Sequence, residues 1–436
     1  MKKRNIVYMH THDTGRYIQP YGYEVPTSNL QRLAEEGVLF RHAYCAGPTC
    51  SPSRAALLTG MAPHSAGMTG LAHRGFRLHD YRRHLARFLN SQGYVTALSG
   101  VQHEVAQENV GELGYAHHLN ERVDTSSGDW ENIDLRRAEL AAEFIRQPHD
   151  KPFFLSVGLF HTHRVKDVFP SKPGNPNYVL PPFPMYDNAE NREDMAGFIA
   201  SAGMVDRAAG IVLAAIEEAG LREDTIFIFT TDHGIAFPHM KCNLYDTGIG
   251  VALIMRVPGM RQGVASDALV SHIDLFPTLC ELNGLEKPAW LQGTSLVPLL
   301  EGTAERVNGC IFSEVTYHAA YEPMRCIRTE RYKLIRRYDE TYQGVVLPNI
   351  DDGLGKRFLL RHGLKERRPA REMLFDLYLD PVERENVIDR PEYAAVREEL
   401  RAALTEWMQC TGDPLLFGPV LPPPGARVTP QGDIDP

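Results

Sequence analysis

Residues 50–60 read CSPSRAALLTG and join a cysteine, a helix start and an arginine within one short stretch. Pro52 suits the first turn of a helix, and Gly60 can end that helix in a left-handed conformation. Cys50 then lies at the helix N-terminus, where free N–H groups and the helix dipole attract anions. Arg54, about one turn further on, can donate a charge-assisted hydrogen bond. The stretch therefore predicts chemistry on a tetrahedral oxyanion.

Three interpretations of Cys50 compete. A free thiol in a soluble protein is usually a buried structural residue, and a thiol at a helix N-terminus can instead be a low-pKa nucleophile. The third interpretation comes from the motif. Cys-x-Pro-Ser-Arg followed by Leu-Thr-Gly resembles the signature of the type I sulfatases, in which the cysteine is oxidised to formylglycine. This motif is a hypothesis that the rest of the chain must support.

The composition is that of a globular protein with an acidic excess. The chain has 436 residues, of which 43% are hydrophobic, a formal net charge of -9 and a mean hydropathy of -0.29. This length allows one large domain and a smaller one. The negative charge argues against a nucleic-acid partner, so an anionic substrate needs a locally basic pocket. No apolar run approaches the roughly 20 residues of a membrane span, so we expect no membrane partner.

The compartment is predicted from the first residues and the cysteines. Residues 1–4 lead directly into a strand-like segment without the apolar core and cleavage site of a signal peptide. The seven cysteines are odd in number and scattered, which favours reduced thiols in a cytoplasm over a disulfide framework. We therefore expect a cytoplasmic protein, although a leader removed beforehand would escape this argument.

Short strand-like runs alternate with helical stretches in the first part of the chain. Such alternation implies an α/β fold with a mainly parallel sheet that is covered by helices on both faces. In such sheets the chemistry gathers at the carboxyl ends of the strands. The expected strands are residues 5–11, 94–98, 153–159 and 225–230, and the expected helices are 28–36, ended by Gly37, and about 190–219.

Beyond about residue 300 the pattern changes to closely spaced strand candidates followed by one helix, which suggests a smaller antiparallel α+β subdomain. The strand candidates are residues 310–314, 324–328, 332–336 and 374–377, and the helix is about 391–409. We predict a catalytic domain at 1–305, an antiparallel subdomain at 306–420 and a Pro-rich extended tail at 421–436.

Acidic residues and histidines follow two of the predicted strands. In the sulfatases, and in the wider alkaline phosphatase superfamily, the first strand ends in a metal-binding acidic pair. Asp13 matches this pair, whereas His12 departs from it. An imidazole ligand would move the site from calcium towards manganese or zinc, although His12 can also be a structural histidine. The resemblance implies one divalent metal (Ca, Mn or Zn), held by Asp13, His12, Asp232, His233 and the formylglycine derived from Cys50.

Further residues stand in the family's order. His103 matches a Gly-Lys-x-His element in which Val101 replaces the lysine, His163 matches a Pro-His element, and Lys241 matches a lysine that contacts the substrate anion. The resemblance implies that formylglycine is the nucleophile and that His163 or His103 protonates the leaving group. The implied catalytic residues are Cys50, Arg54, His103, His163 and Lys241, and His73 and His161 are the implied substrate contacts.

The resemblance covers almost the whole chain and is nearest to the heparan N-sulfatase type, on residues 70–73, 160–164 and 234–238. It implies an alkaline phosphatase-like fold and hydrolysis of a sulfate ester or sulfamate. The expected partners are a sulfated small molecule or saccharide and a formylglycine-generating enzyme, and a homo-oligomer is left open. The alternatives are a phosphonate monoester or phosphodiester hydrolase with the same machinery, an amidohydrolase using His10-Thr11-His12, and a non-catalytic binding protein.

Overall fold

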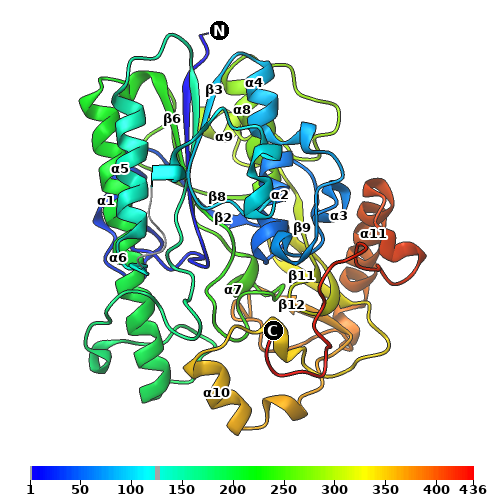
Figure 1. Cartoon of the computed structure of the whole chain (residues 1–436). Helices are drawn as coiled ribbons and strands as arrows, with labels where there is room; N and C mark the ends of the chain where they lie inside the picture. Colours follow the sequence, from blue (N-terminus) through cyan, green and yellow to red (C-terminus); the bar gives the residue numbers. More distant parts are fainter. Residues whose placement is uncertain (1, 123–127) are drawn as a thin grey trace.

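Two β-sheets organise the computed structural model, which describes residues 2–122 and 128–436 (Figure 1). Within those residues, eight strands form the large sheet in the order β4-β3-β5-β1-β6-β7-β2-β8. β7 runs antiparallel to its neighbours β6 and β2, and the other pairs are parallel. The strands are β1 (Asn5–Thr11), β2 (Val38–Tyr44), β3 (Val95–Gly100), β4 (His117–His118), β5 (Phe153–Gly158), β6 (Thr225–Thr231), β7 (Leu253–Arg256) and β8 (Val264–Ser271).

The central strands of this sheet are buried on both faces. Every residue of β6 is buried, and so are all but the first of β1, as expected for strands that helices cover on both sides. β1 pairs with β6 in the register Thr11 to Thr231. The residues that follow the two strands therefore emerge side by side at the carboxyl edge of the sheet.

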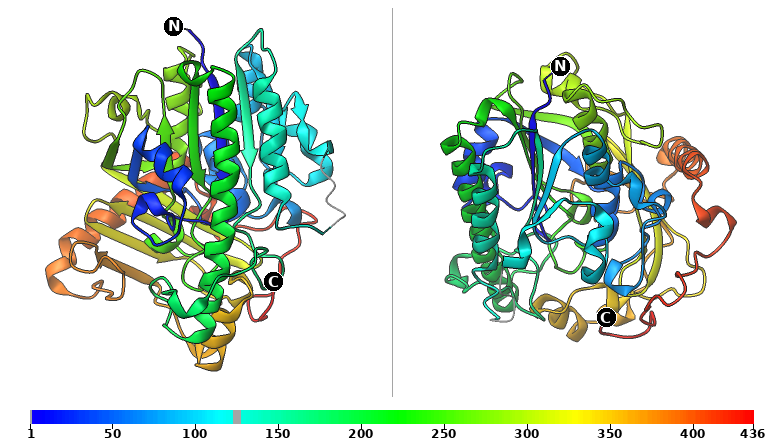
Figure 2. Two further views of the ribbon diagram at one scale, coloured as in Figure 1. Left: turned by 90° about the vertical axis from the view of Figure 1, so that its left-hand side faces the viewer. Right: turned by 45° about the horizontal axis from the view of Figure 1, so that its top comes forward.

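Helices pack on both faces of the large sheet, as the α/β fold class predicted. On one face lie α1 (Ser28–Glu35), α5 (Ile133–Arg146) and α6 (Ala189–Glu218), and Figure 2 shows α5 and α6 running along the sheet. On the other face lie α2 (Cys50–Thr59), α4 (Leu85–Ser91), α8 (Leu275–Leu282) and α9 (Val297–Glu301), while α3 (Pro63–Ala66) packs beside α2. The short α7 (Asp246–Ile249) and α10 (Leu354–Arg361) lie lower in the same view.

α6 is an exception to the expectation that no apolar run is long enough to cross a membrane. It has 30 residues and a mean hydropathy of 1.6 over its most apolar window, so by length and composition alone it could span a bilayer. However, 61% of that window is buried inside the protein, and Val205, Val212 and Ile216 pack in one cluster with α5 and the sheet. Burial of this kind is that of a core helix.

The second sheet is antiparallel and has the order β12-β11-β10-β9. α11 (Ala394–Thr411) packs on it through Leu400, Leu404 and Met408, and these elements correspond to the antiparallel sheet and helix predicted beyond residue 300. The tail at 421–436 contains neither helix nor strand. The strands of this sheet are β9 (Cys310–Tyr317), β10 (Tyr321–Thr329), β11 (Tyr332–Arg337) and β12 (Glu372–Asp376).

Candidate active site

The stretch at 50–60 forms the predicted helix, α2, and Cys50 is its first residue. Gly60 ends it at φ 68°, and its N–H donates to the carbonyl of Ala56 at 2.8 Å. The loop before the helix is held by neighbouring segments, because the N–H groups of Cys242 and Glu314 donate to the carbonyls of Pro48 and Ala46, both at 2.9 Å. These bonds fix Cys50 at the border of a cavity of about 800 Å³.

Ligand atoms from three segments converge beside Cys50. His12 and Asp13 follow β1, Asp232 follows β6, and Cys50 comes from α2. One ligand atom from each of these residues lies within 4.8 Å of one from every other, and all four residues are buried. The N–H of Asp13 donates to Oδ1 of Asp232 at 2.8 Å, which ties the two strand ends together. We call these four residues the catalytic cluster.

Two atoms of the catalytic cluster fit a cation. Nδ1 of His12 and Oδ1 of Asp13 are buried and make no hydrogen bond, although Nδ1 lies 3.3 Å from Oδ2 of Asp232 and Oδ1 lies 3.4 Å from Nε2 of His233. Burial, and secondarily the charge of Arg54, lower the pKa of His12 well below its ordinary value. The ring is therefore neutral and has a lone pair for a metal. Unpaired buried acceptors are costly unless a ligand satisfies them, so these residues fit the divalent metal that the resemblance implied.

His233 lies against the same cluster. Its Nδ1 is 3.0 Å from the carbonyl of Gly234, which can only accept, so Nδ1 carries the proton and Nε2 of a neutral ring has the lone pair. Nε2 lies 3.4 Å from Sγ of Cys50 and 3.4 Å from Oδ1 of Asp13. His233 therefore adds a second imidazole nitrogen at the edge of the cluster.

Arg54 lies behind the cluster, and it is not among the residues that border the cavity. Its side chain is fully buried; Nη2 donates to Oδ2 of Asp232 at 3.0 Å and to the carbonyl of Thr11 at 2.9 Å, while Nη1 donates to Nδ1 of His10. The sequence predicted that Arg54 would contact the transferring group. In the structure its contacts orient Asp232 instead.

Lys241 is a buried cation next to the cluster. Its Nζ lies 3.0 Å from Oδ2 of Asp13 and 3.1 Å from Oδ2 of Asp351. Burial opposes the charge, but Asp13 and Asp351 raise the pKa of Lys241 well above its ordinary value. An ammonium has three N–H donors, and Lys241 borders the cavity, so it keeps a donor for an anion bound there.

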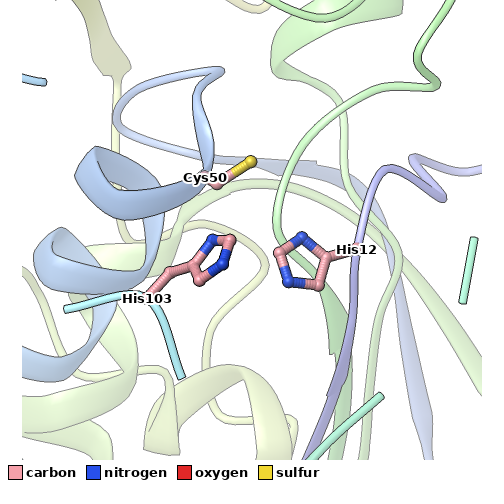
Figure 3. A group of neighbouring side chains, drawn as sticks. All are labelled: His12, Cys50 and His103. Carbon is pink, nitrogen blue, oxygen red and sulfur yellow. The ribbon is translucent and has the colours of Figure 1, made fainter. Parts of the chain in front are cut away.

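Four histidines border the cavity, of which the sequence predicted His73, His103 and His163 as site residues. Figure 3 shows the rings of His12 and His103 facing one another below Sγ of Cys50, with ring centroids 4.7 Å apart. His163 lies edge-on to His12 at 5.2 Å, and its Nδ1 is 2.7 Å from the carbonyl of Arg164. His73 is 6.1 Å from His103. The structure thus brings His73, His103 and His163 together at one cavity.

His161 is not brought into this group. Its side chain is fully buried, its Nδ1 donates to Oδ2 of Asp134 at 2.7 Å, and it is not among the residues that border the cavity. The neighbouring His163 points to the cavity because the chain turns between the two residues. A substrate contact, as predicted for His161, has no geometric support here.

Other cavity residues come from segments that carry no recognisable motif. Asp351 pairs with Lys241, and His318 is buried with its Nδ1 unpaired. No sequence signal points to them, because each borders the cavity only through the docking of the small sheet and the tail. Further members of the lining are Arg74, Lys166, Asp167, Lys356, Ile434, Asp435 and Pro436.

The environment of Cys50 bears on the three interpretations of this residue. Cys50 is 2% exposed, and burial raises the pKa of its thiol well above the ordinary value, although Lys241 acts in the opposite direction. An unmodified Cys50 is therefore a protonated thiol, which is a poor nucleophile. Its position at a polar cavity also differs from that of a structural core cysteine.

Comparisons with known proteins agree with the resemblance found in the sequence. The sulfatase family profile matches residues 4–285, and the profile for the C-terminal part of N-sulphoglucosamine sulphohydrolase matches residues 235–351. The chain is 30% identical to N-sulphoglucosamine sulphohydrolase from Homo sapiens, with 91% of this chain and 88% of that protein covered. It is 28% identical to an ulvan-active sulfatase from Formosa agariphila, with 94% and 76% covered.

Solved structures share the fold. The structure of BT4656 with its substrate D-glucosamine-2-N,6-O-disulfate superimposes with a TM-score of 0.73 at 20% identity and covers 94% of this chain and 99% of that chain. The structure of BT1596, a 2-O GAG sulfatase, gives a TM-score of 0.72 at 23% identity and covers 98% and 96%. Together with the family matches, these likenesses do not favour the phosphonate or phosphodiester alternative, nor the amidohydrolase one.

Proposed function

The chain belongs to the sulfatase family, whose members hydrolyse sulfuric esters or sulfamates, and from this premise we propose that it removes sulfate from a carbohydrate with a formylglycine made from Cys50 and one divalent metal. The observation that carries this proposal is the catalytic cluster, in which unpaired ligand atoms meet Cys50 at a helix N-terminus beside a cavity.

The carbohydrate substrate is supported by the relatives. The human relative is named for N-sulphoglucosamine, the Formosa relatives for ulvan, and BT4656 is described with a disulfated glucosamine. The cavity is lined by cations and carboxylates rather than by apolar groups alone, which suits a ligand with hydroxyl and sulfate groups. We propose a sulfate ester or a sulfamate on a sugar as the bond that is cleaved.

The metal would be held by His12, Asp13, Asp232 and the modified residue 50, with His233 at the edge of the site. Two imidazole nitrogens combined with carboxylate oxygens favour manganese or zinc over calcium, which prefers oxygen ligands. When bound, the metal would polarise the sulfate oxygens and lower the pKa of the formylglycine hydroxyl that attacks sulfur.

The chain's own residues would orient the anion and supply the proton. The positive N-terminal end of α2 and the ammonium of Lys241 would stabilise negative charge on the transferring group. His163 is better placed than His103 to protonate the leaving group. Its side chain is 28% exposed and its Nε2 is free of the carbonyl bond made by Nδ1, whereas burial lowers the pKa of His103 well below the ordinary value.

The test of this proposal is the mass of the peptide that carries Cys50, in protein co-expressed with a formylglycine-generating enzyme, together with hydrolysis of 4-nitrophenyl sulfate. We expect an aldehyde at residue 50 and turnover that a chelator abolishes. An unmodified thiol, with the co-expressed enzyme active on a control protein, would remove the proposed nucleophile. Turnover of an aryl phosphonate in preference to the sulfate would reassign the substrate class.

We also propose the cytoplasm as the compartment. All seven cysteines are free thiols, six of them buried or partly buried, and free thiols in this number suit a reducing environment. Cell fractionation of the native organism tests this, and recovery from an extracytoplasmic fraction would contradict it.

A further inference from the structure

The segment 421–436 crosses from the small subdomain to the cavity as an ordered strap. In Figure 1 it runs from the end of α11 to a chain end beside α10. Its backbone is bonded on the way: the N–H of Arg427 donates to the carbonyl of Arg74 at 2.8 Å, and the N–H of Thr429 donates to the carbonyl of Ala319 at 2.9 Å. We call residues 421–436 the strap.

The strap lies directly on the residues that lead into the cavity. Gly75 has φ +98°, and a Cβ at this position would lie 3.0 Å from Cα of Ala426. A side chain at residue 75 would therefore displace the strap as well as strain the backbone. Arg74 borders the cavity and donates to Oγ1 of Thr429 at 3.1 Å. The strap thus packs against the cavity wall at Arg74 and Gly75.

A buried lysine anchors the end of the strap. Lys356, in α10, is 2% exposed, and its Nζ donates to the carbonyl of Ile434 at 2.8 Å, the carbonyl of Ile350 at 2.9 Å and Oδ1 of Asp352 at 2.8 Å. A buried ammonium needs all of its donors paired. The carbonyl of Ile434 is one of three acceptors, so Lys356 holds the strap in place at the cavity.

The anchored end of the strap borders the cavity that contains the nucleophile position. Ile434, Asp435 and Pro436 line it together with Cys50 and Lys241. Its volume of about 800 Å³ lies within the range of small-ligand pockets, roughly 300–1,000 Å³. The end of the strap thus forms part of one side of the cavity, and Asp435 adds a carboxylate to this border that would repel a polyanionic chain.

We infer that residues 434–436 determine specificity by limiting the size of the group attached to the sulfate, so that short saccharides enter and long polyanionic chains are excluded. This inference rests on the proposed carbohydrate sulfatase function, since it concerns the substrate of the same cavity. The strap acts through shape and charge at the wall and touches none of the reacting atoms.

The experiment measures how oligosaccharides of glucose 6-sulfate, from one to eight units, inhibit hydrolysis of 4-nitrophenyl sulfate by the full-length metal-loaded protein. The quantity compared is the ratio of two inhibition constants, that of the eight-unit chain divided by that of the single sugar. For the intact protein we expect this ratio to be at least about 10. Deletion of residues 431–436 should bring this ratio close to one. The ratio is used because it is independent of the amount of active enzyme in each preparation.

Point variants keep the inference testable if the deletion variant fails to fold. Asp435→Asn removes charge without removing the wall and should improve inhibition by the eight-unit chain several-fold relative to the single sugar. Lys356→Met releases the anchor and should shift the ratio in the same direction. The matched control is Lys287→Met, a surface lysine that pairs with Glu281, and it should leave the ratio unchanged.

The outcomes separate the two proposals. A chain-length ratio that is the same in the intact protein, Asp435→Asn and Lys356→Met overturns the inference about the strap, as does equally tight binding of long and short chains by the intact protein. Absence of aryl sulfate hydrolysis by protein that carries the aldehyde overturns the proposed function itself. Hydrolysis that no member of the saccharide series inhibits overturns the carbohydrate assignment.

Discussion

Among the residues that the structure describes, two separate and fully buried clusters have the composition of a metal site, but they differ in how their ligand atoms are paired. The catalytic cluster joins His12, Asp13, Cys50 and Asp232, and the second cluster joins His64, Glu314 and Asp413. In both, the ligand atoms lie within 4.8 Å of one another and are buried. Residue types and distances therefore do not separate them.

A protein cation pairs with both carboxylates of the second cluster, although Nε2 of His64 makes no hydrogen bond. Nε of Arg325 lies 2.5 Å from Oδ2 of Asp413 and 3.4 Å from Oε2 of Glu314. Nδ1 of His64 pairs with the same oxygen of Glu314. It is also absent from the cavity at Cys50. In the catalytic cluster Cys50 borders the cavity, and behind it an imidazole nitrogen of His12 and a carboxylate oxygen of Asp13 make no hydrogen bond. Unpaired ligand atoms next to a residue that borders a cavity, rather than a donor set alone, distinguish the candidate active site.

The second cluster joins the small sheet to α3 and to the loop before the nucleophile. Oε1 of Glu314, in β9, accepts from the N–H of His64 at 2.7 Å, and the N–H of Glu314 donates to the carbonyl of Ala46 in the loop before Cys50. The cluster thus supports the segment that carries Cys50 without sharing its chemistry. We call it the clamp cluster.

The largest effect is expected at Cys50. Cys50→Ala should lower turnover of 4-nitrophenyl sulfate by at least about 10³-fold, because the proposed nucleophile is lost, while the melting temperature changes little. Steady-state kinetics and thermal unfolding measure the two quantities. Cys410→Ser, at an exposed thiol, is the matched control and should leave turnover unchanged. Sustained turnover by Cys50→Ala would contradict the formylglycine mechanism.

The clamp cluster should respond in the opposite way. Arg325→Met leaves two buried carboxylates without their cation, so the free energy of unfolding should fall by about 3–5 kcal/mol, with turnover per folded molecule nearly preserved. Urea denaturation measures this loss. Arg331→Met removes a partner of Asp376 at a half-exposed arginine and should cost about 1 kcal/mol or less. If the two variants are equally stable, the clamp cluster has no structural role.

A smaller effect is expected at His10, which supports the catalytic cluster through Arg54. Because Nη1 of Arg54 donates to Nδ1 of His10, His10→Leu removes the acceptor and frees Arg54 to turn from Asp232. Metal affinity, measured by titration of the metal-free protein, should fall about 10–100-fold. Asn has the shape of Leu and an acceptor near the Nδ1 position, so His10→Asn should restore part of the affinity. Equal affinities for both variants would make His10 a packing residue only.

The smallest effect is expected at His84, as a dependence of stability on pH. Its buried ring bonds a backbone N–H, whereas the buried ring of His64 pairs with the carboxylate of Glu314. His84 caps α4 by accepting the N–H of Ala86, and burial lowers its pKa to about 3. As the pH falls, this histidine takes up a proton near pH 6.5 in the unfolded chain but stays neutral in the folded protein. The free energy of unfolding is therefore highest above about pH 6.5 and decreases below it. Between pH 8 and pH 6 the loss should be about 1 kcal/mol.

The variant His84→Asn keeps an acceptor for the helix cap and removes the titration. Its unfolding free energy should therefore change by about 1 kcal/mol less than that of the parent protein between the two pH values. Urea denaturation at pH 8 and pH 6 measures both. An identical pH dependence in the two proteins would assign the acid sensitivity to other groups.

Much of the fold could be predicted from local patterns. The strands at 5–11, 153–159 and 225–230 and the helix near 190–219 agree with β1, β5, β6 and α6 within one or two residues, because long apolar runs have only a few ways to be buried. β2, β4, β7 and β8 have no counterpart among the predicted strands. β7 is a four-residue antiparallel strand, and half of β8 lies at the exposed sheet edge, so neither has a strong pattern of its own.

The sequence by itself determined the helix at 50–60 and the pairs at the ends of β1 and β6, because each depends on a few consecutive residues and on the rule that parallel strands end at one edge. Only the tertiary structure decided that Arg54 turns towards Asp232, that His161 is buried against Asp134, and that Asp351 and the strap complete the cavity. These contacts join segments far apart in the chain. They follow from strand register and from the docking of the small sheet, which no local pattern of residues encodes.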